Sequence, residues 1–149
     1  MPVTPARVFL DASVLFAGAH SPKGPSGLVM EACTAGALDG VVSELVILEA
    51  RRALASKSTS RGQTRLAQFL ASRRVETVGF PSSKAMEQYL GLIHTKDVHV
   101  LTAAIGARCQ TLLTLDKKHF FTPALQRTAL HLTVATPMQF LSDRLASGE

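Results

Sequence analysis

The chain alternates short, predominantly apolar runs with longer segments in which apolar residues recur at helical spacing. Val8–Leu10 and Thr111–Leu115 are the clearest runs, and such runs are typical of strands buried on both faces of a parallel sheet. Weaker strand candidates lie at residues 40–42, 75–80 and 130–135. Because strands and helices alternate, we expect an α/β fold with a mostly parallel sheet covered by helices on both faces.

Helices are predicted between these strands, roughly at residues 26–35, 44–55, 63–72, 83–92 and 98–107, with a last one opening at Pro137. Ser43 and Thr136 stand where N-caps are expected, and Pro137 suits the first helical position. The predicted buried faces of three of these helices include Leu28, Leu48 and Leu90. Residues 17–27 are rich in Gly, Pro and Ser and are predicted to form a loop.

Length and composition fit one globular domain over residues 1–149, since 46% of the chain is apolar. The formal charge of +5 favours an anionic partner. Seven of the sixteen Lys and Arg residues lie between Glu49 and Glu76, an interval without an acid. They lie on or beside two predicted helices, 44–55 and 63–72, that we call the basic hairpin. We interpret it as a surface for nucleic acid or an acidic protein, although a solvated helical face is the simpler alternative.

Cys33 and Cys109 are far apart and form no Cys-x-x-Cys pair, so we expect free, buried thiols in a reducing compartment. No signal peptide is visible, and no apolar run approaches the length of a membrane span. The expected location is the cytoplasm, without a membrane partner.

Four carboxylates stand at strand ends or on apolar helix faces. Asp11 and Asp116 each follow a buried strand, where open α/β sheets bind ligands. Glu49 shares the apolar side of its predicted helix, and Asp97 lies in the first turn of another. Local explanations remain open for three of them. Asp11 could cap the next turn, Glu49 could pair with Arg51 or Arg52, and Asp97 could serve the helix dipole.

Four neighbouring carboxylates repel one another, which raises their pKa values. A bound divalent cation removes that penalty, and an all-oxygen site selects Mg²⁺ or Mn²⁺. Such ions can activate water and stabilise a phosphate undergoing substitution. Together with the basic hairpin, this chemistry indicates hydrolysis of phosphodiester bonds.

Several segments, in this order, resemble the PIN-domain family, in particular its VapC-type toxin ribonucleases. The matching segments are Phe9–Leu15, Ser43–Glu49 with Arg52 and Leu54, Lys96–Asp97 through Ala104, and Leu113–Asp116 followed by His119-Phe120. The resemblance implies a three-layer sandwich around a five-stranded sheet and a single-strand ribonuclease that requires Mg²⁺ or Mn²⁺. It implies that catalysis and metal binding fall to Asp11, Glu49, Asp97 and Asp116.

The resemblance also assigns supporting positions and partners. Ser13 and Thr114 match small polar positions of the motif and are expected to support the acids or hold water. Family toxins are commonly homodimers inhibited by a cognate antitoxin. The expected RNA contacts on the basic hairpin are Arg51, Arg52, Arg61 and Arg65.

The chain departs from the family pattern at His119, where an acidic residue is frequent. It is the one histidine that we expect could touch substrate, and the others are expected at the surface or at helix ends. One rival is a phosphoryl-transfer or receiver domain, which would need a second acid near the first strand end, where Ser13 stands, and which leaves Glu49 without a role. The other is a non-catalytic PIN-fold module that binds RNA or protein.

Overall fold

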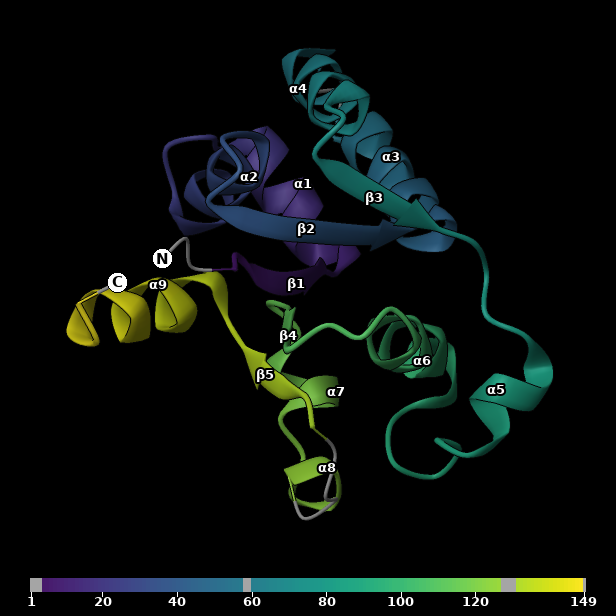
Figure 1. The fold of residues 1–149 in the computed structure, drawn as a ribbon. Coiled ribbons are helices and arrows are strands. Elements are labelled where there is room, and N and C mark those ends of the chain that lie inside the picture. The colour runs from purple at the N-terminus through teal and green to yellow at the C-terminus, as the bar shows by residue number, and fades with distance from the viewer. Residues whose placement is uncertain (1–3, 58–59, 127–130, 149) are drawn as a thin grey trace.

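Five parallel strands form the central sheet of the computed structural model, which describes residues 4–57, 60–126 and 131–148. The strands are β1 (Ala6–Leu10), β2 (Leu38–Ser43), β3 (Val75–Val78), β4 (Thr111–Leu113) and β5 (Thr133–Ala135). Their order in the sheet is β3-β2-β1-β4-β5, and all four pairings are parallel (Figure 1). The predicted strand 130–135 is confirmed over Thr133–Ala135, while Leu130 lies outside the described residues.

The helices fall into two groups according to the strands that they connect. Between β1 and β3 lie α1 (Ala12–His20), α2 (Pro25–Thr34), α3 (Glu44–Ser56) and α4 (Ser60–Ala71). After β3 come α5 (Ser83–Glu87), the 3-10 helix η1 (Thr95–Asp97), α6 (Val98–Gly106), α7 (Lys117–Phe120), α8 (Pro123–Gln126) and α9 (Pro137–Ala146). Right-handed crossovers put α1–α4 on one face and α5–α8 on the other, and the two groups are separate in Figure 1. The predicted three-layer α/β sandwich is confirmed.

The core lies on both faces of the two central strands. Val8, Phe9 and Leu10 of β1 are fully buried, as are Leu112 and Leu113 of β4. In α6, every residue from Val98 to Ala104 is buried, so this helix packs on all sides between the sheet and its neighbours. The predicted free, buried thiols are present, and burial raises the pKa of each to about 12.

Several local predictions are wrong. The predicted loop 17–27 is helical over Ala17–His20, because α1 continues through Gly18, which fits closely against Met30 of α2. The predicted helix 83–92 ends at Glu87, and an isolated bridge joins Leu90 to Ile93 instead. Leu28, Leu48 and Leu90 are exposed rather than buried, because neighbouring residues in their segments face the core.

The sheet order creates a switch point between β1 and β4. From β1 the chain moves outward through β2 to β3, and then returns to the other side of β1 to form β4 and β5. At such a point the crossovers leave in opposite directions and open a crevice at the carboxyl ends of the two strands. Asp11 follows β1 and Asp116 follows β4, so both acids stand at this crevice.

None of the helices in the described ranges is both long and apolar enough to cross a lipid bilayer.

Candidate metal centre

Asp11 is a buried carboxylate held by three donors. The backbone N–H of Ala12 donates to its Oδ1 at 2.8 Å, so the residue does cap α1. Its Oδ2 accepts from the Thr114 hydroxyl at 2.7 Å and from the Ser13 hydroxyl at 3.2 Å. Burial raises the pKa of Asp11 despite these hydrogen bonds, and the negative charge of Asp97 adds to the rise. A capping role alone would not require a carboxylate 7% exposed beside a second one.

Ser13 and Thr114 connect Asp11 to the segment that carries Asp116. The backbone N–H of Leu115 donates to the Ser13 hydroxyl at 3.0 Å, and that of Asp116 donates to the Thr114 hydroxyl at 3.1 Å. Each hydroxyl therefore accepts from the segment after β4 while donating to Asp11. Two short polar side chains thus fix the position of both acids across the switch point.

Asp97, Asp116 and His119 form a compact group whose potential ligand atoms all lie within 4.8 Å of one another. His119 Nδ1 is 2.7 Å from Asp116 Oδ2 and 3.2 Å from Asp97 Oδ2. Although that second distance is short, its geometry makes no hydrogen bond, and Asp97 Oδ2 is buried without a hydrogen-bond partner among the described residues. Asp97 also makes no side-chain cap to α6. A capping role at the start of α6 therefore does not explain the Asp97 carboxylate.

Glu49 joins this neighbourhood through His99. The alternative of a pair with Arg51 or Arg52 is not the contact found, because Glu49 Oε1 lies 3.0 Å from His99 Nε2 on α6. The side chain of Glu49 is 43% exposed, so it stands at the mouth of the site rather than in the core. Partial burial raises its pKa, the contact with His99 opposes the rise, and the charges of Asp11 and Asp97 add to it.

Two histidines have a larger part in the site than the sequence predicts. His99 is expected at the surface or a helix end, but it is 6% exposed and orients Glu49. His119 is expected to touch substrate at most, whereas it lies among the acids. A signal for His99 is present, since a titratable residue two positions after Asp97 interrupts a predominantly apolar helix. For His119 the only signal is its place in the motif that follows β4.

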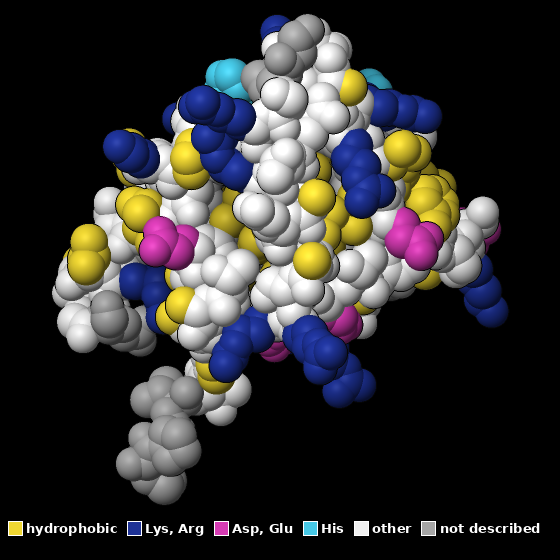
Figure 2. Space-filling view, turned by 90° about the horizontal axis from the view of Figure 1, so that it is seen from above, with side chains coloured by type: hydrophobic (Ala, Val, Ile, Leu, Met, Phe, Trp, Pro, Cys, Tyr) yellow, Lys and Arg dark blue, Asp and Glu magenta, His cyan; other side chains and the backbone are white. Residues whose placement is uncertain are grey.

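The basic hairpin consists of α3 and α4. Arg51, Arg52 and Arg61 are exposed, whereas Arg65 is partly buried and donates to the carbonyl of Ala19 at 2.7 Å. Arg65 therefore also holds α4 against α1. Figure 2, which views the molecule from the α4 side, shows Lys and Arg side chains spread over the face rather than gathered in a single patch.

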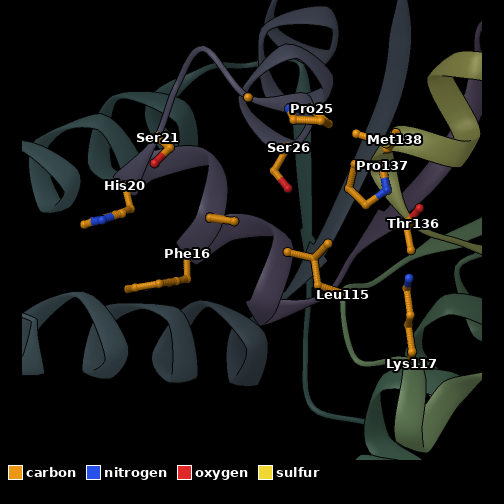
Figure 3. Close-up of a pocket in the computed structure, with 12 residues that line it drawn as sticks. Phe16, His20, Ser21, Pro25, Ser26, Leu115, Lys117, Thr136, Pro137 and Met138 are labelled. Carbon is orange, nitrogen blue, oxygen red and sulfur yellow. The ribbon is translucent and has the colours of Figure 1, made fainter.

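A pocket of about 450 Å³ lies next to the acids but does not contain them. Leu115 and Lys117 line it, whereas Asp116 between them does not. The other walls come from Phe16 of α1, from the start of α2 and from the start of α9. In Figure 3, Lys117 extends from α7 toward Thr136. The acid group and this pocket are therefore separate sites that share the segment after β4.

The residues present fit a divalent cation. The donor set consists of carboxylate oxygens and one imidazole nitrogen. Compared with an all-oxygen site, this set favours Mn²⁺ over Mg²⁺. Asp97 Oδ2 is the atom that a cation would satisfy, because it is buried, makes no hydrogen bond among the described residues and has only the ion-pair contact with His119. Asp97, Asp116 and His119 would be its nearest ligands, with Asp11 and Glu49 close enough to perturb one another's charge.

Comparison with known proteins agrees with this geometry. The family model described as "PIN domain" matches residues 7–118. Among curated protein sequences, no significant match was found.

Solved structures with the same fold include VapBC2 from Rickettsia felis bound to a promoter DNA fragment (TM-score 0.61, 21% identity, 87% of this chain and 98% of that chain). A toxin–antitoxin complex from Klebsiella pneumoniae matches with a TM-score of 0.57 and 16% identity over 87% of this chain and 97% of that chain. The sarcin-ricin loop cleaving toxin VapC20 from Mycobacterium tuberculosis matches with a TM-score of 0.56 and 15% identity over 74% of this chain and 91% of that chain. At these identities the likeness concerns the fold.

The family model covers most of the sequence, including Asp11, Glu49, Asp97 and Asp116. The chain therefore belongs to the PIN-domain family.

Proposed function

We propose that this protein is a metal-dependent endoribonuclease that hydrolyses phosphodiester bonds in single-stranded RNA. The main supporting observation is the convergence of Asp11, Glu49, Asp97 and Asp116 from four separate segments at one edge of the sheet. Asp97 Oδ2 is buried there without a hydrogen-bond partner among the described residues. Placing these charges together without a cation destabilises the fold, so a role in binding an ion and a phosphate accounts for the arrangement.

In the proposed mechanism, Asp97, Asp116 and His119 would hold Mg²⁺ or Mn²⁺, and Asp11 and Glu49 would complete the site. The bound ion would supply a Lewis acid that activates water and offsets charge on the phosphate. Ser13 and Thr114 keep Asp11 in place through their hydroxyls. Glu49 is held by His99, is open to solvent and has a raised pKa, which suits it to accept the proton of the attacking water.

We further propose that the protein is a cytoplasmic toxin inhibited by a cognate antitoxin, and that it acts as a homodimer. Support comes from family membership and from solved neighbours of the same fold, one of which is described as a toxin–antitoxin complex and another as a toxin. Exposed Arg51, Arg52 and Arg61, with Arg65, would guide RNA through its phosphates.

The decisive experiment is cleavage of a labelled pool of single-stranded RNA with Mg²⁺, with Mn²⁺ and with EDTA. Asp116→Ala serves as the test variant. Asp143→Ala serves as its matched control, because Asp143 is an exposed acid on α9. We expect cleavage by the wild type and by Asp143→Ala only with metal, and at least about 100-fold slower cleavage by Asp116→Ala.

A second readout removes the dependence on finding the right RNA. Mn²⁺ should raise the melting temperature of the wild type and of Asp143→Ala, because it binds only the folded state, and should do so much less for Asp116→Ala. A folded wild type that neither cleaves RNA nor gains stability from either ion would replace this proposal with the non-catalytic binding module.

A further inference from the structure

Phe80 is an exposed aromatic side chain at the carboxyl edge of the sheet. It follows β3 by two residues, on the edge where the acids lie, and it is 56% exposed. Among the large hydrophobic side chains that are exposed in the described ranges, it is the sole aromatic. An aliphatic side chain would fill the same space, so an open ring at this edge calls for its own explanation.

One face of the Phe80 ring rests on His99. The two ring centroids are 6.2 Å apart and the planes differ by 18°, which is an offset stack. His99 in turn contacts Glu49 at 3.0 Å. Pro81 follows directly and restricts Phe80 to an extended backbone. The ring is therefore held one side chain away from Glu49, the proposed catalytic base, and more than half of Phe80 is exposed to solvent.

The segment between Phe80 and α6 exposes mostly polar side chains, although Glu87 and Leu90 are exposed there as well. Ser82, Ser83, Lys84 and Lys96 are exposed on the neighbouring segments before α6. A large contiguous apolar patch would indicate a protein interface, whereas an exposed ring with Lys84 and Lys96 on the adjoining segments suits a nucleotide, whose base can stack and whose phosphate needs a counter-charge.

We propose that the exposed ring of Phe80 stacks a base of the single-stranded RNA next to the phosphate at the acid site. This inference rests on the proposed function for its substrate class. Proteins commonly hold unpaired bases on aromatic faces, and such stacking tolerates different bases because every base has a π-face. Phe80 would thus contribute binding and alignment of RNA but no chemical step. In this arrangement His99 connects RNA binding with the chemical step, because it supports the Phe80 ring and orients Glu49.

The test measures RNA binding in EDTA, so that cleavage plays no part. The variants are Phe80→Ala, Phe80→Leu, which keeps apolar bulk without a π-face, and Phe80→Tyr, which keeps the ring. Leu145→Ala is the matched control, because Leu145 is also an exposed large apolar residue but lies on α9. We expect Phe80→Ala and Phe80→Leu to bind roughly 5- to 100-fold more weakly, and Phe80→Tyr and Leu145→Ala to bind like the wild type.

A fluorescent 2-aminopurine placed at successive positions of the RNA locates the stacked base. We expect quenching at one position adjacent to the cleavage site, and its loss in Phe80→Ala. With metal, the same variant should raise KM more than it lowers kcat, because stacking contributes binding rather than chemistry.

The outcomes separate this inference from the proposed function. If the wild type cleaves RNA and Phe80→Leu binds it as well as Phe80→Tyr does, the stacking role is wrong while the nuclease stands. If no metal supports cleavage but RNA binding still depends on the Phe80 ring, the nuclease is wrong while the stacking role stands. A wild type that binds no RNA overturns the inference. So does a Phe80→Ala protein whose weaker binding is explained by dissociation of a dimer, seen by sedimentation.

Discussion

At the residue scale, Asp11 is a carboxylate whose burial lowers the stability of the folded protein when it is charged. A carboxylate at the end of a strand could be solvated at little cost, but this one is buried against Thr114 and faces the charge of Asp97. Three hydrogen bonds only partly offset that burial, since the pKa of Asp11 remains raised. The unfavourable charge is tolerated because the fold around it is fixed by β1 and β4.

We predict that Asp11→Asn makes the metal-free protein less sensitive to pH. The raised pKa values of Asp11 and Glu49 mean that the folded state binds protons more tightly than the unfolded chain. The contribution of Asp11 to stability is therefore highest below its ordinary pKa of 3.8 and falls as pH rises through the raised value. Thermal denaturation in EDTA between about pH 4 and pH 8 should show a shallower fall for Asp11→Asn than for the wild type.

The same substitution should reduce metal-dependent cleavage by roughly 100-fold or more, because the amide cannot bring a charge to the site. Asp143→Asn is the control for both measurements. A pH dependence identical in Asp11→Asn and wild type would mean that burial of Asp11 does not govern stability here.

At the scale of the element, α3 combines a helix cap, a catalytic candidate and a basic face. Ser43 begins the helix by accepting from the backbone N–H of Val46 at 3.3 Å, and Glu49 follows at the mouth of the site. Arg51 and Arg52 are then exposed to solvent, and α4 adds exposed Arg61. The basic hairpin therefore places Glu49 at the mouth of the acid site and exposes its arginines to solvent.

We predict that Arg52→Ala with Arg61→Ala weakens RNA binding and flattens its dependence on salt. Removing one contact to a phosphate should reduce the slope of log affinity against log salt by about 0.7 for a single strand. Fluorescence anisotropy at several salt concentrations measures this slope. Arg65→Ala is an informative comparison, because loss of its hydrogen bond to Ala19 should lower stability as well. An unchanged slope in the double variant would make the basic hairpin an ordinary solvated face.

At the scale of the whole molecule, the carboxyl and amino edges of the sheet differ in the side chains that they gather. The carboxyl edge gathers the acids, whereas the amino edge is held by Arg7 of β1. Its guanidinium lies 2.9 Å from Asp39 of β2 and 3.0 Å from Glu76 of β3. Its Nε also donates to the carbonyl of Ala107 after α6 at 2.7 Å. One side chain therefore joins three strands and the end of a helix.

We predict that Arg7→Met lowers the free energy of unfolding by about 1–2 kcal/mol, a value reduced because the acids are half exposed. Chemical denaturation measures the change. Metal-dependent cleavage by the folded variant should match the wild type, because the site lies at the opposite edge. A large loss of activity with unchanged stability would show that the two edges are coupled.

The sequence predicted the strands and acids whose signals are local. Val8–Leu10 and Thr111–Leu115 indicate buried strands because every residue is apolar or β-branched, although the second strand ends at Leu113. The acids after them follow from strand ends. The caps at Ser43 and Thr136 were equally predictable, since each serves the backbone N–H three residues later. The helical course of α1 was not predicted, because Gly18, Pro22 and Gly24 suggest a loop, while close packing against α2 favours the helix.

The sequence by itself thus determined the fold class, the family motifs and the acids, because hydrophobic period, capping and strand ends depend on neighbours in the chain. Tertiary structure alone decided which side chains meet. Glu49 and His99 are distant in the sequence, and Asp11 and Thr114 are joined across the switch point, so neither contact has a local signal. Likewise, His119 lies between Asp97 and Asp116 only because α7 begins at the carboxyl end of β4 next to α6.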